Sequence, residues 1–387
     1  MVTTGLERLC GDLAERVRGR RVGVLCHHAS VTAKLAFAVD ALRKAGARVV
    51  RLLGPEHGPW GTAQDMVAVA SGKDRWTGLD LVSLYGDHEG SLAPDESALA
   101  GLDVLVIDLQ DVGARYYTYA ETAARAVLAA ARAGIEALVC DRPNPLGGAS
   151  IEGNLLRDEC TSFVGMHPVP QRHGLSFGEL VKSYVEPECA VEVIPMQGWR
   201  RDMWFDQTGL PWIPPSPNMP TLTTALVYPG LCLLEGTNVS EGRGTTTPFE
   251  VFGAPFVDPF RLARSLSRLD LPGVAFRPHV FQPTFQKYVG QACGGVQIVV
   301  TDRDLARPVR LGIAILCTLR SLWPDEVRWR TESYEFVSER PAIDLLLGDP
   351  RLRERIDAGA SVAEVTEGFA ADEATFADLR EAWLIHG

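Results

Sequence analysis

The sequence predicts an α/β fold in which a parallel sheet with helices on both faces is followed by a second, smaller α+β domain. Short runs rich in β-branched and aliphatic residues alternate with segments of helical periodicity in the first part of the chain, a pattern typical of βαβ units. The chain has 387 residues, which is more than one hydrophobic core usually organises. We therefore expect two folding units that share a cleft.

The first unit contains five predicted strands and at least two helices. The strands are short apolar runs at residues 21–26, 48–53, 81–84, 104–109 and 137–140. Between them, residues 33–45 and 119–133 carry apolar side chains at helical spacing. Residues 54–80 are rich in glycine and lie between two strands, which indicates a functional loop.

Capping and proline signals mark the end of the first unit. Ser176 and Glu179 match a capping box, so a helix is expected to begin there, followed by a strand over residues 191–196. The proline-dense segment 211–221 excludes regular helix and central strand, which indicates a boundary or a rigid wall. We place the first domain at residues 1–224 and the second at residues 225–387.

The second unit is predicted from a mixed pattern. A glycine-rich loop over residues 236–253 precedes segments that resemble both helices and strands. Helices are expected at residues 259–269, 305–322, 351–356 and 375–385, and strands near Val274 and Gln297.

Charge and cysteine content narrow the class of protein. The chain has 38 Lys and Arg against 49 Asp and Glu, a formal charge of -11, which argues against a nucleic-acid partner. Its eight cysteines are scattered without CxxC pairs, so reduced core residues are expected and neither a metal nor a cofactor is predicted. No signal-like apolar segment or membrane-length apolar run is visible, so we expect a cytoplasmic protein without a membrane span.

Chemically reactive residues follow all five predicted strands. Ligands of open parallel sheets bind beyond the carboxyl ends of the strands, where loops converge. Helix capping would explain the Asp and Asn residues at these exits, but not the glutamate, arginines and tyrosines beside them. The exits carry His27 and His28, then Glu56 and His57, then Tyr85, Asp87 and His88, then Asp108, Gln110, Asp111, Arg115 and Tyr117, and finally Asp141, Arg142 and Asn144.

Glu56 is the candidate general acid, because it follows a strand between Pro55 and His57 on a glycine-flanked turn. Burial against Trp60 or Trp76 would raise its pKa in the required direction. Asp108 and Asp111 are further catalytic candidates, with a buried structural role for Asp108 as the alternative.

Arginines near the predicted cleft could bind a substrate carboxylate. Arg115 and Arg142 could each form a bidentate contact with such a group, or could pair with Asp108 instead. The loop 235–250 combines glycines and hydroxyls with Glu241 and Arg243, and we expect it to close the cleft from the other side. A metal site built from the histidines and aspartates remains an alternative, although the HxH and HExxH spacings are absent.

The order of the motifs resembles the exo-β-N-acetylmuramidase family. The resemblance is carried by PEHG (55–58), SLYG (83–86), DLQDVGARYYTY (108–119), DRPNPLGG (141–148), HGLSFGEL (173–180) and EGTNVSEGRGTTTPFEVFGAP (235–255). It runs from about Arg21 to the C-terminus. The family is described as a Rossmann-like domain plus a smaller second domain with the active site between them.

The resemblance implies a glycoside hydrolase that releases terminal N-acetylmuramic acid from the non-reducing end of peptidoglycan fragments. It makes Glu56 the leading acid/base, with Asp108, Asp111 or Glu241 as the second carboxylate. The predicted substrate-binding residues are His57, Tyr85, Gln110, Arg115, Tyr117, Asp141, Arg142, Asn144, His173, Asn238, Arg243 and Thr245. A metal-dependent hydrolase of a small polar substrate and a non-catalytic muramyl-sugar-binding protein are the alternatives.

Overall fold

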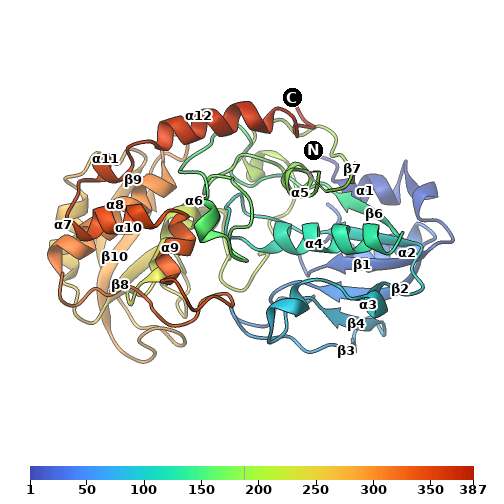
Figure 1. Ribbon diagram of the computed structural model, residues 1–387, viewed down its shortest axis with the longest axis horizontal. Coiled ribbons are helices and arrows are strands. Elements are labelled where there is room, and N and C mark those ends of the chain that lie inside the picture. Colours follow the sequence, from blue (N-terminus) through green and yellow to red (C-terminus); the bar gives the residue numbers. More distant parts are fainter. Residues whose placement is uncertain (187) are drawn as a thin grey trace.

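The computed structural model describes residues 1–186 and 188–387, which form two units side by side (Figure 1). The first unit is built on a seven-stranded sheet of order β3-β4-β2-β1-β5-β6-β7. All neighbouring strands pair in parallel except β3, which is antiparallel to β4. The strands are β1 (Arg21–Cys26), β2 (Arg48–Gly54), β3 (Gly72–Lys73), β4 (Asp80–Ser83), β5 (Val104–Asp108), β6 (Glu136–Cys140) and β7 (Glu192–Ile194).

Helices cover both faces of this sheet because alternate strand residues point to opposite sides. Val104 and Val106 of β5 pack with α1 and α2, whereas Leu105 and Ile107 pack with α4 and α5. This burial on both faces explains why β1 and β5 read as continuous apolar runs. The helices are α1 (Gly5–Cys10), α2 (Ala38–Lys44), α3 (Glu96–Leu99), α4 (Tyr119–Arg132) and α5 (Phe177–Val185), with 3₁₀ turns η1 (Ala14–Arg16), η2 (Glu89–Leu92), η3 (Asp158–Cys160) and η4 (Phe205–Gln207).

The second unit packs helices on a three-stranded antiparallel sheet of order β8-β10-β9. Helices α6 and α8 approach closely at Gly230 and Gly312, where a Cβ atom on Gly230 would lie 1.8 Å from the carbonyl oxygen of Pro308. Its elements are α6 (Leu222–Leu231), η5 (Cys232–Gly236), β8 (Val251–Ala254), α7 (Pro259–Leu266), β9 (Val274–Phe281), β10 (Cys293–Val300), α8 (Pro308–Leu322), α9 (Ala342–Leu347), α10 (Pro350–Asp357), α11 (Val362–Val365) and α12 (Phe369–Arg380).

The C-terminal segment ties the second unit to the first. Helix α12 runs from the second unit back to the first, where both termini lie close together (Figure 1). Arg380 donates to the carbonyl of Gly148, and the ring Nε2 of His386 lies 2.6 Å from Asp141 Oδ2. The backbone N–H of Ile385 donates to Glu179. These contacts hold the two units around the space between them.

The predicted α/β class with a smaller second domain is confirmed, and each of the five predicted parallel strands is present within one residue of its expected ends. The capping box at Ser176 and Glu179 is present. Helix 33–45 was predicted too long: α2 begins at Ala38, because Leu35 adopts a left-handed backbone inside a turn closed by the pairing of Val31 with Phe37. Helix 375–385 was placed too late in the chain, since α12 spans Phe369–Arg380. The boundary at residues 224 and 225 lies within α6 and stays a prediction.

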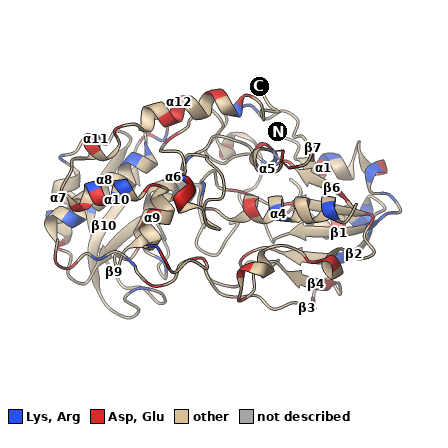
Figure 2. Ribbon diagram, viewed as in Figure 1, with Lys and Arg blue, Asp and Glu red and all other residues tan. Residues whose placement is uncertain are grey.

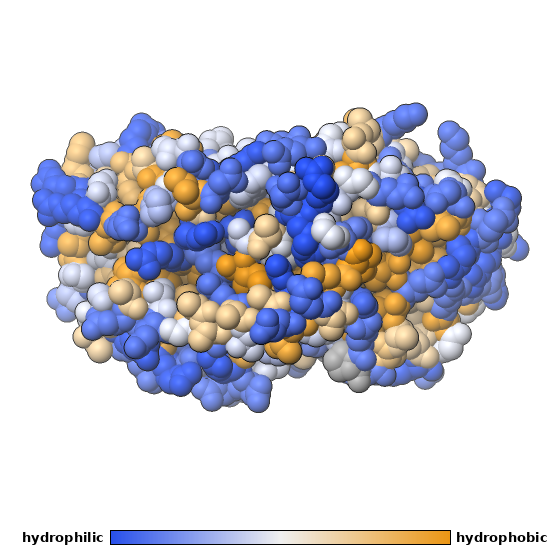
Figure 3. Space-filling model, turned by 90° about the horizontal axis from the view of Figure 1, so that it is seen from above, coloured by the Kyte–Doolittle hydropathy of each residue, from blue (hydrophilic) through white to orange (hydrophobic). Residues whose placement is uncertain are grey.

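Charges of both signs are mixed along the two units (Figure 2). The face seen in Figure 3 is mostly polar, with smaller apolar areas between the polar residues. In the described ranges, no helix is both long and apolar enough to cross a bilayer.

Candidate active site

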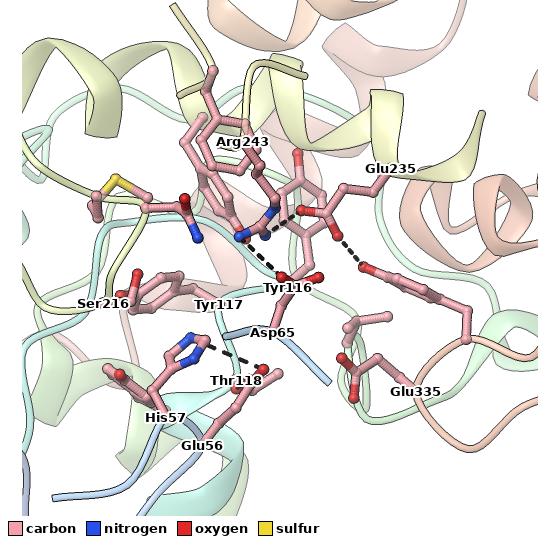
Figure 4. Close-up of a pocket in the computed structure, with 17 residues that line it drawn as sticks. Glu56, His57, Asp65, Tyr116, Tyr117, Thr118, Ser216, Glu235, Arg243 and Glu335 are labelled. Atoms are coloured by element: carbon pink, nitrogen blue, oxygen red, sulfur yellow. Dashed lines mark hydrogen bonds and ion pairs between the residues drawn. The ribbon is translucent and has the colours of Figure 1, made fainter. Parts of the chain in front are cut away.

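A narrow pocket lies between the carboxyl edge of the parallel sheet and the second unit (Figure 4). The first unit contributes Glu56, His57, Asp65 and the run Tyr116–Tyr119, and the second contributes Glu235, Arg243, Phe249, Tyr334 and Glu335. Ser216, Asn218 and Met219 of the proline-dense segment also line it. Its free volume is about 40 Å³, enough for a few waters, so a hexosamine requires the flanking loops to move apart.

Glu56 enters this pocket from a tight turn directly after β2. The N–H of Gly58 donates to the carbonyl of Pro55, and both His57 and Gly58 have positive φ angles of 66° and 73°. A left-handed conformation at a histidine is strained and is typical of functional sites. Glu56 is 6% exposed and accepts a 2.8 Å hydrogen bond from the Thr118 hydroxyl. The imidazole Nε2 of His57 lies 3.9 Å from its Oε1 atom.

The proline-dense segment forms one wall of the pocket, as the sequence predicted. His27 binds this wall: its Nδ1 lies 3.1 Å from the carbonyl of Pro215, and its Nε2 accepts a hydrogen bond from the Gln110 N–H. That acceptor role places the proton on Nδ1. Burial lowers the pKa of His27 well below its usual range, which agrees with a neutral ring. The hydroxyl of Tyr119 donates to the same carbonyl of Pro215.

Arg243 is held by three carboxylates on the opposite side of the pocket. Its guanidinium lies 2.6 Å from Glu235 and 3.4 Å from both Asp65 and Glu241. Glu241 in turn accepts a 2.9 Å bond from Lys287 and does not line the pocket. The three acids compensate the charge of the buried guanidinium, although only Glu235 accepts a hydrogen bond from it and its Nε atom has no hydrogen-bond partner among the described residues. Arg243 therefore lines the pocket without presenting a free fork to a substrate.

Glu335 is a pocket carboxyl that the sequence did not indicate. It is 6% exposed and accepts a 3.0 Å hydrogen bond from the Tyr85 hydroxyl. Burial, followed by the nearby charge of Glu56, raises the pKa of Glu335 well above its ordinary value. Its φ angle is 46° and that of Phe336 is 67°, so two successive residues adopt strained left-handed backbone. No motif in the surrounding sequence singles out this glutamate.

Asp108 and Arg142, predicted as a catalytic and a substrate-binding residue, form a buried ion pair with each other. The guanidinium of Arg142 makes two 2.7 Å bonds to the Asp108 carboxylate and a third bond to the carbonyl of Val31. Asp108 is fully buried, and neither residue lines the pocket. This pairing supports the structural alternative considered for Asp108, since each group has the other as its partner.

Arg115 and Asp111 also have internal partners. The Arg115 guanidinium donates to the backbone carbonyls of Asn154, Val169 and Leu346, and thus joins the first unit to α9. Asp111 accepts from the N–H of Gly113 at 2.5 Å, and His173 lies 3.6 Å away. Neither residue lines the pocket.

The remaining predicted site residues divide into a small group at the pocket and a larger group with structural contacts. His57 and Tyr117 line the pocket, and Tyr85 reaches it through Glu335. The others bind neighbouring backbone or side chains away from it: Gln110 to the carbonyls of Asp111 and Pro143, Asp141 to Ser176 and His386, Asn144 to Leu175, His173 to Leu175, Asn238 to Glu326 and Arg328, and Thr245 to Gly242.

No cluster of three or more His, Cys, Asp or Glu side chains suited to a metal ion occurs among residues 1–186 and 188–387. The pocket is lined by four carboxyls, by His57, by tyrosines and by the buried Arg243; Asp65 and Glu235 contact Arg243, which leaves Glu56 and Glu335 as the two carboxyls not paired with it. Paired carboxyls with different surroundings are suited to proton transfer, since one can hold a proton while the other stays ionised.

Comparisons with known proteins match the whole length of the chain. A family model described as "Exo-beta-N-acetylmuramidase NamZ, N-terminal" matches residues 22–223, and its C-terminal counterpart matches residues 226–386. The chain is 41% identical to the peptidoglycan beta-N-acetylmuramidase NamZ of Bacillus subtilis (strain 168), covering 100% of this chain and 91% of that protein.

Two crystal structures of DUF1343 family proteins from Bacteroides fragilis NCTC 9343 are similar in fold. One has a TM-score of 0.87 at 33% identity, and the other a TM-score of 0.76 at 28% identity. Each alignment covers 100% of this chain and 99% of the other.

Proposed function

Because this chain belongs to the exo-β-N-acetylmuramidase NamZ family, we propose that the pocket containing Glu56 and Glu335 is where it cleaves its substrate. The full-length relationship confirms the prediction of a glycoside hydrolase that acts as an exo-β-N-acetylmuramidase. The proposed substrates are peptidoglycan fragments with N-acetylmuramic acid at the non-reducing end. This terminal sugar occupies the pocket.

One observation carries the assignment of the site: two buried carboxyls, one from each unit, line the same pocket on different sides (Figure 4). Most glycoside hydrolases use such a pair, with one carboxyl protonating the leaving oxygen and the other acting on the opposite side of the sugar. In this pair the surroundings differ. Glu56 accepts a hydrogen bond from the Thr118 hydroxyl, while burial and the nearby charge of Glu56 raise the pKa of Glu335 well above its ordinary value.

These surroundings assign the roles. Glu335 gives its proton to the glycosidic oxygen as the bond from that oxygen to the anomeric carbon breaks. Glu56, as carboxylate, faces the positive charge that develops at the anomeric carbon and takes the proton of the attacking water, whose hydroxyl ends on that carbon. This reverses the role expected for Glu56 from its sequence context. The net reaction is hydrolysis, and the proton on Glu56 returns to Glu335 through solvent.

Substrates with different leaving groups test this assignment. Glu335→Gln removes the proton donor, so hydrolysis of the N-acetylmuramyl–N-acetylglucosamine disaccharide should fall by at least about 10²-fold, a typical contribution of general acid catalysis. A 4-methylumbelliferyl N-acetylmuramide needs little protonation, so its hydrolysis should fall far less. Glu56→Gln should abolish hydrolysis of both. The matched control is Glu339→Gln, an exposed glutamate four residues beyond Glu335.

If Glu335→Gln lowers the rate of hydrolysis equally for both substrates, Glu335 is not the general acid. If Glu56→Gln keeps wild-type activity, Glu56 has no part in the mechanism. Measuring wild-type activity before and after dialysis against EDTA separates this function from the metal-dependent alternative. Retained activity is expected, since the proposed acid and base are both side chains. Binding of muramyl ligands without product release would instead favour the sugar-binding protein.

A further inference from the structure

A second and larger cavity opens beside the pocket in the second unit. We call it the basic groove; its lining includes three cations (Lys287, Arg328 and Arg330), two aromatic residues (Tyr288 and Trp329) and one acid, Glu332. Its free volume is about 600 Å³, against about 40 Å³ for the pocket. Sites of this size accommodate ligands as large as a short peptide.

The basic groove borders the pocket directly. Gln286 donates a 2.9 Å hydrogen bond to Asp65, which lines the pocket. The guanidinium of Arg330 reaches the sulfur of Met66 at 3.6 Å and lies 5.0 Å from the ring centre of Tyr334, another pocket residue. Gln286 and Arg330 of the groove therefore contact the segment Asp65–Met66, whose first residue lines the pocket. A substituent on a sugar in the pocket could pass over this segment.

The positive charges of the basic groove exceed the single negative charge of Glu332, and Glu332 forms no ion pair with Arg328 or Arg330 among the described residues. Lys287 is engaged with Glu241 and with the carbonyls of Leu234 and Val239. Within the described part of the chain, by contrast, neither Arg328 nor Arg330 has a carboxylate within 4.0 Å. Two arginines without acidic partners on a chain of net charge -11 indicate a local site for anions.

The backbone of this region is also unusual. Gln286 and Tyr288 have φ angles of 67° and 58°, in the left-handed region that favours glycine. Such strain persists where the surrounding structure requires it, and it is concentrated at binding sites. Tyr288 and Trp329 are half-buried, so each presents part of an aromatic face to the groove. Aromatic faces beside arginines suit an extended peptide with acidic groups.

We propose that the basic groove binds the acidic peptide stem that the lactyl arm of N-acetylmuramic acid carries in peptidoglycan, while the sugar itself lies in the pocket. This inference rests on the proposed function, which supplies the sugar. Arg328 and Arg330 pair with the free carboxylates of the stem. Neutral sugar units alone would leave both arginines without anionic partners, so the charge favours the peptide as the occupant.

The test compares a muramyl disaccharide bearing a tripeptide stem with the same disaccharide lacking the peptide. Arg328→Gln removes a cation whose guanidinium has no hydrogen bond to other described residues, so the fold should be retained. The ratio of kcat/KM values, peptide-bearing over peptide-free, should fall about tenfold in this variant, chiefly through KM, as loss of one charge-assisted contact predicts. Arg328→Lys should restore part of the ratio.

Two controls sharpen the result. Arg268→Gln, an exposed arginine elsewhere in the second unit, should leave the ratio unchanged. A tripeptide stem with amidated carboxyl groups should give the wild-type protein the lower ratio of Arg328→Gln, because the anionic groups are gone. An unchanged ratio in Arg328→Gln, with normal cleavage of both disaccharides, would overturn the peptide site while leaving the proposed function intact. Failure of the wild-type protein to cleave either disaccharide would overturn both.

Discussion

The hydroxyl of Tyr85 donates a 3.0 Å hydrogen bond to Glu335, joining the exit of a strand in the first unit to a loop of the second. This bond favours the ionised form of Glu335 and therefore opposes the effect of burial on its pKa. It links the protonation of the proposed acid to the relative position of the two units.

Tyr85→Phe removes this donor while keeping the ring. Because the bond stabilises the carboxylate, its loss should raise the pKa of Glu335 further. The basic limb of the pH profile of kcat/KM should then move to higher pH by about one unit, which corresponds to a hydrogen bond to a charged group worth about 1.5 kcal/mol. An unmoved basic limb would show that Glu335 does not control it.

Local patterns predicted much of the fold. Strand β1 is buried on both faces, so almost every residue in it is apolar, and this continuous apolar run predicts a strand. Glu56 could be predicted because a strand exit followed by a proline and a glycine turn is a local feature. The start of α2 was missed because the turn before it depends on Leu35 adopting a left-handed backbone, which its sequence does not favour.

The rest of the site depends on contacts between distant residues. Tyr85 and Glu335 are 250 residues apart, and no local pattern marks their meeting. Arg142 and Arg115 follow strands in the same way whether they bind a substrate or an internal partner. Only the tertiary structure distinguishes these cases, because the deciding partners are Asp108 and the carbonyls of other loops.

Asp108→Asn should destabilise the fold more than it changes catalysis. The substitution leaves the guanidinium of Arg142 buried without its counterion, which typically costs about 3–5 kcal/mol. Urea denaturation measures this loss. The control Asp103→Asn breaks a half-exposed pair with Arg21 and should destabilise the fold much less than Asp108→Asn. Wild-type stability combined with lost activity would return Asp108 to the catalytic site.

Arg243→Met should also act through stability. Without the guanidinium, Glu235 and Glu241 are left as buried charges close to Asp65, and removing one partner of such a cluster typically costs about 3–5 kcal/mol. The expected result is a lower midpoint of denaturation and a lower yield of folded protein. A variant of normal stability that loses only its preference for muramides over N-acetylglucosaminides would show instead that Arg243 binds the lactyl carboxylate.

Glu152 should make the stability of the protein depend on pH. It is buried where the two units meet, with Oε1 accepting a 2.8 Å bond from the N–H of Arg310 in the first turn of α8. Burial raises its pKa from 4.5 to about 7. A carboxyl with a raised pKa binds more protons in the folded than in the unfolded state between these two values. The contribution of Glu152 to the free energy of unfolding therefore falls as the pH rises from 4.5 to 7, by up to about 3 kcal/mol.

Glu152→Gln tests this linkage, because the amide stays neutral and its oxygen can still accept the Arg310 bond. Any fixed effect of the new NH₂ group is the same at every pH, so the informative quantity is the difference in unfolding free energy between variant and wild type. This difference should shift in favour of the variant as the pH rises from 4.5 to 8, with most of the change before pH 7. A difference that stays constant across this range would mean that Glu152 is ionised, or equally solvated, in both states.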